Sequence, residues 1–357
     1  MGITYREIPD KKTPLEEKAK SIAPENPLFT EPQKLSEFSF RKEGYFQIDR
    51  ASLMPNTSVL FNVFRQKGTG FEPLFTEFTG APVIIDAGVL SKLTCDSACE
   101  IVIEKSAIPH YRAYLNSMAG LPSSSAQAAL LKKVLAMKEN SKLLMKELLD
   151  DPRSGEKIKE VKNMVSNMSD MLLENRDMVH TMLTLSKYDY YTYTHCVNVA
   201  VMSIGLGIAA GLPEEEVRLL GVGAMLHDIG KTAISPDILN KQGKLDEYEY
   251  KRIQEHVKEG GEILKESPEV NEASYPAILQ HHEKLSGSGY PNGLKGDEIA
   301  LFGRVCAIAD CYDALTTERP YKKAFKPYEA LQIVAQDKTD YDANLLAQFI
   351  KMLGKVR

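Results

Sequence analysis

The residues best suited to chemistry in this chain are five of its seven histidines and two of its aspartates. They are His195, His227, Asp228, His256, His281, His282 and Asp310. Imidazole nitrogens and carboxylate oxygens are ligands for first-row metal ions. A lone histidine on an apolar helix is more often a core residue, and His256 alone, in the polar stretch KRIQEHVKEG, would indicate a surface residue. The adjacent His-Asp and His-His pairs weaken that interpretation and indicate a metal site.

The number of these donors indicates more than one metal ion. Seven candidate ligands exceed the six of one octahedral ion, and a catalytic ion keeps a position open. If His281 and His282 are helical neighbours, their side chains point about 100° apart, which favours two ions over one. Asp228 can bridge two ions because its carboxylate has two oxygens. Two-metal sites activate a hydroxide for in-line attack on phosphorus, so this set predicts phosphate ester hydrolysis.

Basic residues close to these donors suit an anionic ligand. Lys231 follows Asp228 by three residues and can meet a phosphate oxygen as a point charge. The run DCYDALTTERPYKKA places Asp313 on one helical face with the last donor aspartate, and Arg319 and Lys322 beyond it. A basic pair standing alone would indicate a solvated surface. Directly after a metal-site aspartate, it favours phosphate binding.

A glycine-rich loop follows the two adjacent histidines. The segment SGSGYPNGL, residues 286–294, contains three glycines and a proline around Tyr290. Such a composition is typical of any tight turn. In this position it also predicts a rigid turn that presents Tyr290 and its backbone to the site or to a guanine base.

The rest of the sequence divides into four segments. Residues 1–44 are polar and proline-containing and predict an irregular arm, whereas 45–122 contain short β-rich runs and predict a small α+β or β-rich regulatory domain. Apolar spacing over 123–150 predicts an interdomain helix, and 151–357 read as nearly all helix. The expected helices in this last segment are 157–187, 191–210, 213–226, 246–265, 275–284, 302–314 and 327–335. The predicted fold is therefore two-domain, with an all-α C-terminal bundle.

Composition excludes several classes of protein. A length of 357 residues allows two domains, and a net charge of −5 disfavours a non-specific nucleic-acid binder. Five cysteines form no paired framework, which is typical of a reducing compartment. The charged N-terminus has no secretory pattern, and the longest apolar stretch, 197–212, is too short to span a bilayer. These features predict a cytoplasmic protein.

Four motifs together resemble the HD-GYP family, a subgroup of the HD metal phosphohydrolases. They are His227-Asp228-Ile-Gly-Lys231, His281-His282-Glu283, Gly289-Tyr290-Pro291 and the run from Asp310 to Lys322. The resemblance covers about 180–335 strongly. It implies an HD-type helical bundle with two or three metal ions, often iron. It also implies hydrolysis of cyclic di-GMP to pGpG and onward to GMP, while some members prefer cyclic GMP-AMP.

The resemblance implies roles for individual residues. The implied metal ligands are His195, His227, Asp228, His256, His281, His282 and Asp310, with Asp228 as the bridge. Asp228 and Lys231 are the implied catalytic residues, and the implied substrate contacts are Lys231, Tyr290, Asp313, Arg319 and Lys322. Members with three metals carry a glutamate where this chain has Tyr191, so two divalent ions are expected, with iron favoured and manganese or another first-row metal allowed. A second departure is Ser286, where the family commonly shows an aspartate.

The expected function is that of a metal-dependent phosphodiesterase that cleaves cyclic di-GMP by attack of a metal-bound hydroxide on phosphorus. The alternative is a catalytically slow sensor or interaction protein that binds the cyclic dinucleotide. A nucleotide phosphohydrolase of the wider HD group is disfavoured by the GYP loop and the RPYKKA segment. The expected partners are cyclic di-GMP or cyclic GMP-AMP, proteins that bind the GYP loop, and a second copy in a homodimer.

Overall fold

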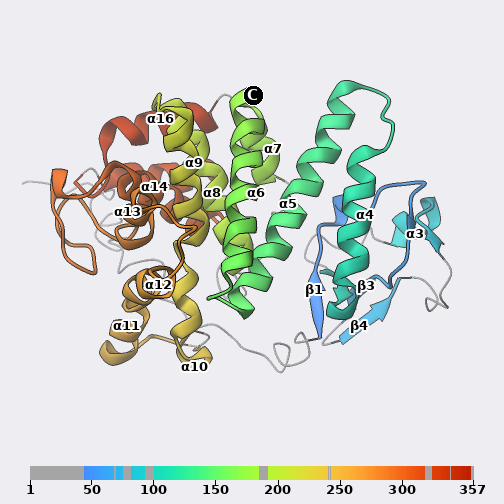
Figure 1. Ribbon diagram of the computed structural model, residues 1–357, viewed down its shortest axis with the longest axis horizontal. Coiled ribbons are helices and arrows are strands. Elements are labelled where there is room, and N and C mark those ends of the chain that lie inside the picture. Colours follow the sequence, from blue (N-terminus) through green and yellow to red (C-terminus); the bar gives the residue numbers. More distant parts are fainter. Residues whose placement is uncertain are drawn as a thin grey trace, which may run out of the picture.

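The computed structural model describes residues 44–67, 70–74, 82–92, 100–184, 192–239, 241, 243–317, 324–337 and 339–354. They form a small α+β region followed by a larger helical bundle (Figure 1). This arrangement confirms the predicted fold class, an all-α C-terminal bundle with a smaller N-terminal α+β domain. The predicted arm lies outside the described residues except for its last residue, and the other segment boundaries remain predictions.

The N-terminal region is built on a four-stranded antiparallel sheet in the order β1-β6-β3-β4. Its strands are β1 (Tyr45–Gln47), β3 (Phe64–Lys67), β4 (Gly70–Pro73) and β6 (Ile101–Glu104). A two-stranded sheet pairs β2 (Ser58–Val59) with β5 (Val83–Ile84). The helical elements are η1 (Arg50–Ser52), α3 (Ala87–Lys92), η2 (Lys105–Ala107) and α4 (Ile108–Gly120). Phe46 and Ile103 face each other across β1 and β6 and are both buried.

Helix α5 (Ala126–Asp150) lies between the sheet region and the bundle (Figure 1). Ser125 begins the helix, because its side chain accepts a hydrogen bond from the backbone N–H of Ala128. One side of α5 packs against α4 and η1, and another packs against the first helices of the bundle. This helix ends where the predicted segment 123–150 ends and begins three residues later than that segment.

The bundle is built around α8 (Thr192–Ala209), which packs against α5 and against helices before and after it in the C-terminal segment. The other helices are α6 (Gly155–Glu174), α7 (Met178–Thr184), α9 (Glu214–Leu226), α10 (Pro236–Leu239), α11 (Glu247–Gln254), α12 (His256–Leu264), α13 (Tyr275–Leu279), α14 (Leu301–Thr316), α15 (Pro327–Gln336) and α16 (Ala343–Leu353). Short 3-10 turns are η3 (Ile229–Ala233), η4 (Glu272–Ser274) and η5 (Gly296–Glu298).

By length and composition, α8 is apolar enough to cross a membrane, but 83% of its residues are buried inside the bundle. Glycines let its neighbours approach closely. A Cβ atom built on Gly205 would lie 2.8 Å from side-chain atoms of Val179 and Met352. The apolar character of α8 is therefore that of the central helix of the bundle.

Two of the expected helices are each divided into two, and a third ends earlier than the sequence pattern predicts. The stretch 157–187 is interrupted after Glu174, where Asn175 adopts an extended conformation and separates α6 from α7. The stretch 246–265 is divided at Glu255 into α11 and α12. The stretch 275–284 is helical only to Leu279, so the adjacent histidines that follow lie in a turn. The expectation that they are helical neighbours about 100° apart is wrong.

Candidate metal centre

Five segments of the bundle bring all seven predicted donors together. His195 lies on the first turn of α8 and Asp310 within α14, whereas the other five residues lie at helix ends or in turns. His227 ends α9, Asp228 begins η3, His256 begins α12, and His281 and His282 follow α13. Their side chains are at most 16% exposed. Histidines at helix ends can turn inward without breaking helical packing.

Hydrogen bonds orient the imidazole rings so that Nε2 faces the centre of the cluster. In three histidines, Nδ1 lies 2.6–2.8 Å from the backbone carbonyl oxygen of the residue three positions earlier. The pairs are His227–Ala224, His256–Ile253 and His281–Ile278. Nδ1 of His195 lies 2.7 Å from Oδ2 of Asp313. A neutral imidazole that donates from Nδ1 keeps its lone pair on Nε2. The rings of His227, His256 and His281 therefore direct Nε2 lone pairs into the cluster, and Nε2 of His195 faces the same centre.

The first group of donors consists of His195, His227 and Asp310. Nε2 of His195 lies 3.2 Å from Nε2 of His227 and 3.1 Å from Oδ1 of Asp310. Oδ2 of Asp228 lies 3.5 Å from both imidazole nitrogens. Two imidazoles and carboxylate oxygens in this arrangement suit one first-row metal ion.

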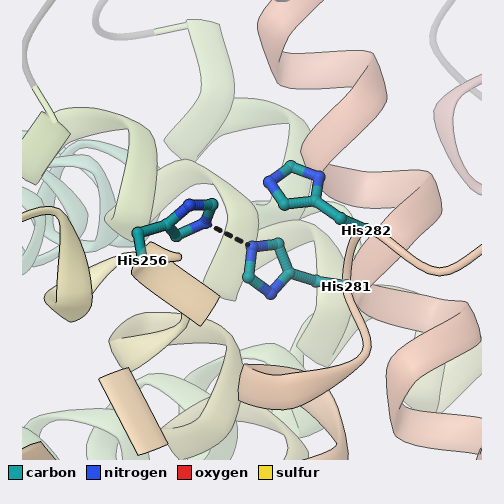
Figure 2. A group of neighbouring side chains, drawn as sticks. All are labelled: His256, His281 and His282. Atoms are coloured by element: carbon teal, nitrogen blue, oxygen red, sulfur yellow. Dashed lines mark hydrogen bonds between the residues drawn. The ribbon is translucent and has the colours of Figure 1, made fainter. Parts of the chain in front are cut away.

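The second group of donors consists of His256, His281 and His282, whose rings are turned toward one another (Figure 2). Nε2 of His256 lies 3.3 Å from Nε2 of His281. Oδ1 of Asp228 lies 3.4 Å from Nε2 of His256. The two oxygens of Asp228 thus face different groups of histidines.

The residues present fit metal ions at both groups. In the second group, the Nδ1 hydrogen bonds of His256 and His281 assign the proton to the far side of each ring, so the lone pairs of the facing Nε2 atoms repel one another unless a cation lies between them. Oδ1 of Asp228 is buried and has no hydrogen-bond partner among the described residues. A metal ion in each group would satisfy these atoms.

Electrostatics favour neutral histidines in the second group. Burial lowers the pKa of His256 to about 4 and that of His282 to about 3, and it holds the pKa of His281 well below its usual value. Burial would raise the pKa of Asp228, but Lys231, whose Nζ lies 2.5 Å from Oδ2, and His227 hold it well below its usual range. The site therefore holds unprotonated nitrogen donors beside an ionised carboxylate.

His195 differs from the other histidines. Burial acts to lower its pKa, but hydrogen bonds to Asp310 and Asp313 raise that pKa to about 9. A metal ion in the first group would therefore displace a proton from His195.

Asp313, which was expected to contact the substrate, lies beneath His195. It is 3% exposed, and its oxygens accept hydrogen bonds from Nδ2 of Asn198 at 3.0 Å and from Oγ1 of Thr317 at 3.1 Å. Because these contacts and His195 occupy both oxygens, the arrangement favours orientation of His195 over a substrate contact. Sequence analysis missed Asn198, which no motif marks.

Tyr290 packs on the second group of donors. The centroid of its ring lies 4.6 Å from that of His282, and its N–H donates to the carbonyl oxygen of His282 at 3.1 Å. A Cβ atom on Gly289 would lie 2.5 Å from the same carbonyl oxygen, so only glycine permits this approach. The Tyr290 hydroxyl is buried without a hydrogen-bond partner among the described residues. The GYP turn thus forms one wall of the site.

Two carboxylates hold the GYP turn in place. The buried Glu283 side chain accepts hydrogen bonds from the backbone N–H groups of Asn292 at 2.7 Å and Leu294 at 3.0 Å. Asp340 accepts a hydrogen bond from Oγ of Ser286 at 2.5 Å. The third residue of the His-His-Glu motif could have indicated the first contact, but nothing in the sequence indicates the second. Three other residues of interest, Tyr191, Arg319 and Lys322, lie outside the described residues.

A family profile described as an HD domain matches residues 163–345, about half of the chain, and includes every donor. The chain belongs to the HD-GYP family. This confirms the resemblance that the motifs carry.

Relatives of this HD-GYP protein include proteins named as cyclic-dinucleotide phosphodiesterases. It is 35% identical over 206 residues to a cyclic di-GMP phosphodiesterase of Pseudomonas aeruginosa, a match that covers 57% of this chain and 50% of that protein. It is 44% identical over 132 residues to 3'3'-cGAMP-specific phosphodiesterase 2 of Vibrio cholerae, covering 37% and 25% of the two chains. The HD-GYP protein therefore matches half or less of the length of these relatives.

A solved structure shares the fold. An HDG"Y"P protein from Bdellovibrio bacteriovorus aligns with 87% of this HD-GYP protein and 99% of its own chain, with a TM-score of 0.65 and 17% sequence identity. The alignment extends beyond the bundle. The combination of the α+β region, α5 and the bundle thus also occurs in that protein.

Proposed function

We propose that this chain is a metal-dependent phosphodiesterase that hydrolyses cyclic di-GMP. The observation that carries this proposal is the position of Asp228, whose Oδ2 faces one group of histidines while Oδ1 faces the other. A carboxylate in that position is suited to bridge two ions. The names of the relatives supply the substrate class, with cyclic GMP-AMP as the alternative dinucleotide.

The residues that would hold the ions divide into two sets. His195, His227 and Asp310 would hold one ion, and His256, His281 and His282 the other, with Asp228 shared. Two divalent ions, of iron or another first-row metal, supply Lewis acidity toward a phosphate and activate water at neutral pH.

Side chains at the edge and on one wall of the site would contact the bound phosphodiester. Lys231 is 25% exposed at the edge of the site, so its ammonium group can meet a phosphate oxygen while it stays close to Asp228. The Tyr290 ring covers His282, and its hydroxyl is directed at no acceptor among the described residues, so it can donate to a bound nucleotide. Arg319 and Lys322 remain proposed phosphate contacts on the sequence pattern.

The decisive experiment measures metal content and products together. The full chain is purified anaerobically, its metals are counted by elemental analysis, and cyclic di-GMP or cyclic GMP-AMP is added while pGpG and GMP are followed by chromatography. Asp228→Ala is the test variant, and Asp237→Ala, an exposed aspartate of α10, is the matched control. About two ions per chain and product formation, both lost only in Asp228→Ala, are expected.

The same experiment separates the enzyme from a sensor. Tight binding of cyclic di-GMP with no product under reducing and oxidising conditions would contradict the proposed activity. It would instead support the slow sensor or interaction protein, particularly if Asp228→Ala bound the dinucleotide unchanged.

A further inference from the structure

An aromatic stack joins the N-terminal sheet to the helix that carries His195. The ring of Phe46 on β1 stacks on that of Tyr193, with centroids 5.5 Å apart and an interplanar angle of 25°. Phe46 is 2% exposed and Tyr193 5% exposed. Tyr193 belongs to the first turn of α8, two residues before His195. A residue of the sheet therefore lies against the turn that supplies a metal donor.

The first turn of α8 depends on such contacts for its position. The first four N–H groups of a helix have no acceptor within the helix, so side-chain packing and neighbouring elements fix the orientation of that turn. The first group of donors depends on this turn through His195. The second group lies on α12 and the turn after α13, which begin elsewhere in the bundle.

Buried charged side chains of α5 also lie close to Phe46. Nζ of Lys142 lies 6.0 Å from the centre of the Phe46 ring and 2.8 Å from Oε1 of Glu139. Oε2 of Glu139 accepts hydrogen bonds from the hydroxyl of Tyr111 at 2.7 Å and from the N–H of Asp49 at 3.2 Å. The side chains of Lys142 and Glu139 are each 1% exposed. Phe46 on β1 thus lies beside a buried network that joins η1, α4 and α5.

A third buried, charged residue of α5 lies between the N-terminal region and the bundle. Lys138 is 1% exposed and donates a hydrogen bond to the carbonyl oxygen of Met182 on α7. Burial and the positive charge of Lys142 lower its pKa to about 8, against the opposing charges of Asp49, Glu139 and Asp313. The ammonium group is therefore within electrostatic reach of Asp49 in the N-terminal region and of Asp313 beneath His195. Helix α5 lies between these regions throughout (Figure 1).

We propose that Phe46 and Tyr193 are positioning residues for His195, so that the N-terminal sheet sets how tightly the first group of donors holds its metal ion. This inference rests on the metal centre of the proposed function, not on the identity of the substrate. It predicts an asymmetry: loss of the stack weakens the ion of the first group and leaves the ion of the second group unchanged.

The test uses Co²⁺ alone, titrated into the metal-depleted full chain in competition with a chromophoric chelator. Phe46→Leu removes the stack and keeps an apolar side chain. Phe61→Leu is the matched control, because Phe61 is also 2% exposed in the N-terminal region and its ring meets only Tyr111 and Tyr114 among the described aromatic residues. The expected result is a roughly tenfold loss of affinity for one of two ions in Phe46→Leu and no change in Phe61→Leu.

A double-mutant cycle tests the same contact from the other side. Tyr193→Leu should weaken the same ion as Phe46→Leu, and the double variant should bind it no more weakly than either single variant. Phe46→Met, which conserves volume, replaces Phe46→Leu if the leucine variant does not fold.

The outcomes separate this inference from the proposed function. If Phe46→Leu binds each of the two ions with the same affinity as Phe61→Leu does, the positioning role is overturned, even when the wild type is an active phosphodiesterase. If the wild type binds two ions and Phe46→Leu weakens only one of them, but the wild type cleaves neither dinucleotide, the proposed activity fails and the positioning role stands.

Discussion

Nδ1 of His195 lies 2.7 Å from Oδ2 of Asp313, although the two residues are 118 positions apart in the sequence. Asn198 donates to the other oxygen of Asp313, so the carboxylate is held in one orientation. A carboxylate behind a histidine fixes the ring and the tautomer that leaves Nε2 unprotonated. The pair therefore connects the last turn of α14 to His195, the candidate metal donor on α8.

Replacing Asp313 by asparagine should weaken the first metal ion. The amide can keep its contact with Asn198, but its NH₂ group then faces Nδ1 of His195 and forces the proton onto Nε2. The expected result is a loss of metal affinity of about 10- to 100-fold, measured by competition with a chelator. Asp237→Asn on the exposed face of α10 is the control. Equal affinity in the two variants would show that Asp313 does not act through His195.

Part of the candidate site could be predicted from the sequence because four of its seven candidate donors occur as adjacent pairs. His227-Asp228 and His281-His282 are neighbours in the chain, and neighbours stay together in any fold. Helix α5 could also be predicted, since its apolar spacing and the serine before it are local signals.

Other features depend on contacts between distant segments and have no local signal. Asn198 reaches Asp313 across 115 positions, and Ser286 reaches Asp340 across 54. The early end of α13 follows from the conformation of Gln280, whose φ of −126° lies outside the helical region. The packing of Phe46 on Tyr193 likewise appears only when the sheet and α8 are placed together.

The pH dependence of stability should reveal the buried Lys138. Its pKa in the folded protein is lowered from 10.5 to about 8, chiefly by burial, so the unfolded chain binds more protons between these values. The contribution of Lys138 to the free energy of unfolding therefore increases as the pH rises from 8 toward 10.5, at a rate approaching about 1.4 kcal/mol per pH unit. Below pH 8 its contribution is constant.

Urea unfolding at several pH values between 8 and 10.5 measures this slope. Lys138→Met should lose the contribution, whereas Lys133→Met, at an exposed position of the same helix, should keep the wild-type slope. Parallel curves for wild type and Lys138→Met would show that this amine titrates as it does in the unfolded chain.

Substitution of Gly289 by alanine should displace the GYP turn. The added Cβ would lie 2.5 Å from backbone atoms of His282, Glu283 and Lys284, none of which can move as a flexible side chain would. We expect a loss of about 1–3 kcal/mol in the free energy of unfolding and a strong loss of dinucleotide cleavage. Gly155→Ala, where no atom lies within 4 Å of the new Cβ, is the control for both measurements. Wild-type cleavage by Gly289→Ala would exclude a role for the position of the turn.

The serine that departs from the common family pattern should be coupled to Asp340. Oγ of Ser286 donates to Oδ1 of Asp340 at 2.5 Å, and Nζ of Lys284 lies 2.6 Å from Oδ2. An aspartate at 286 would bring two carboxylates together in place of this hydrogen bond. Ser286→Asp should therefore lower the free energy of unfolding by about 1 kcal/mol more than Ser286→Ala does.

Asp340→Asn removes the repulsion, so a double-mutant cycle should show a favourable coupling of about 1 kcal/mol between Ser286→Asp and Asp340→Asn. Additive effects in thermal and urea unfolding would show that the loop accommodates the aspartate without Asp340, and that this contact does not hold the GYP turn.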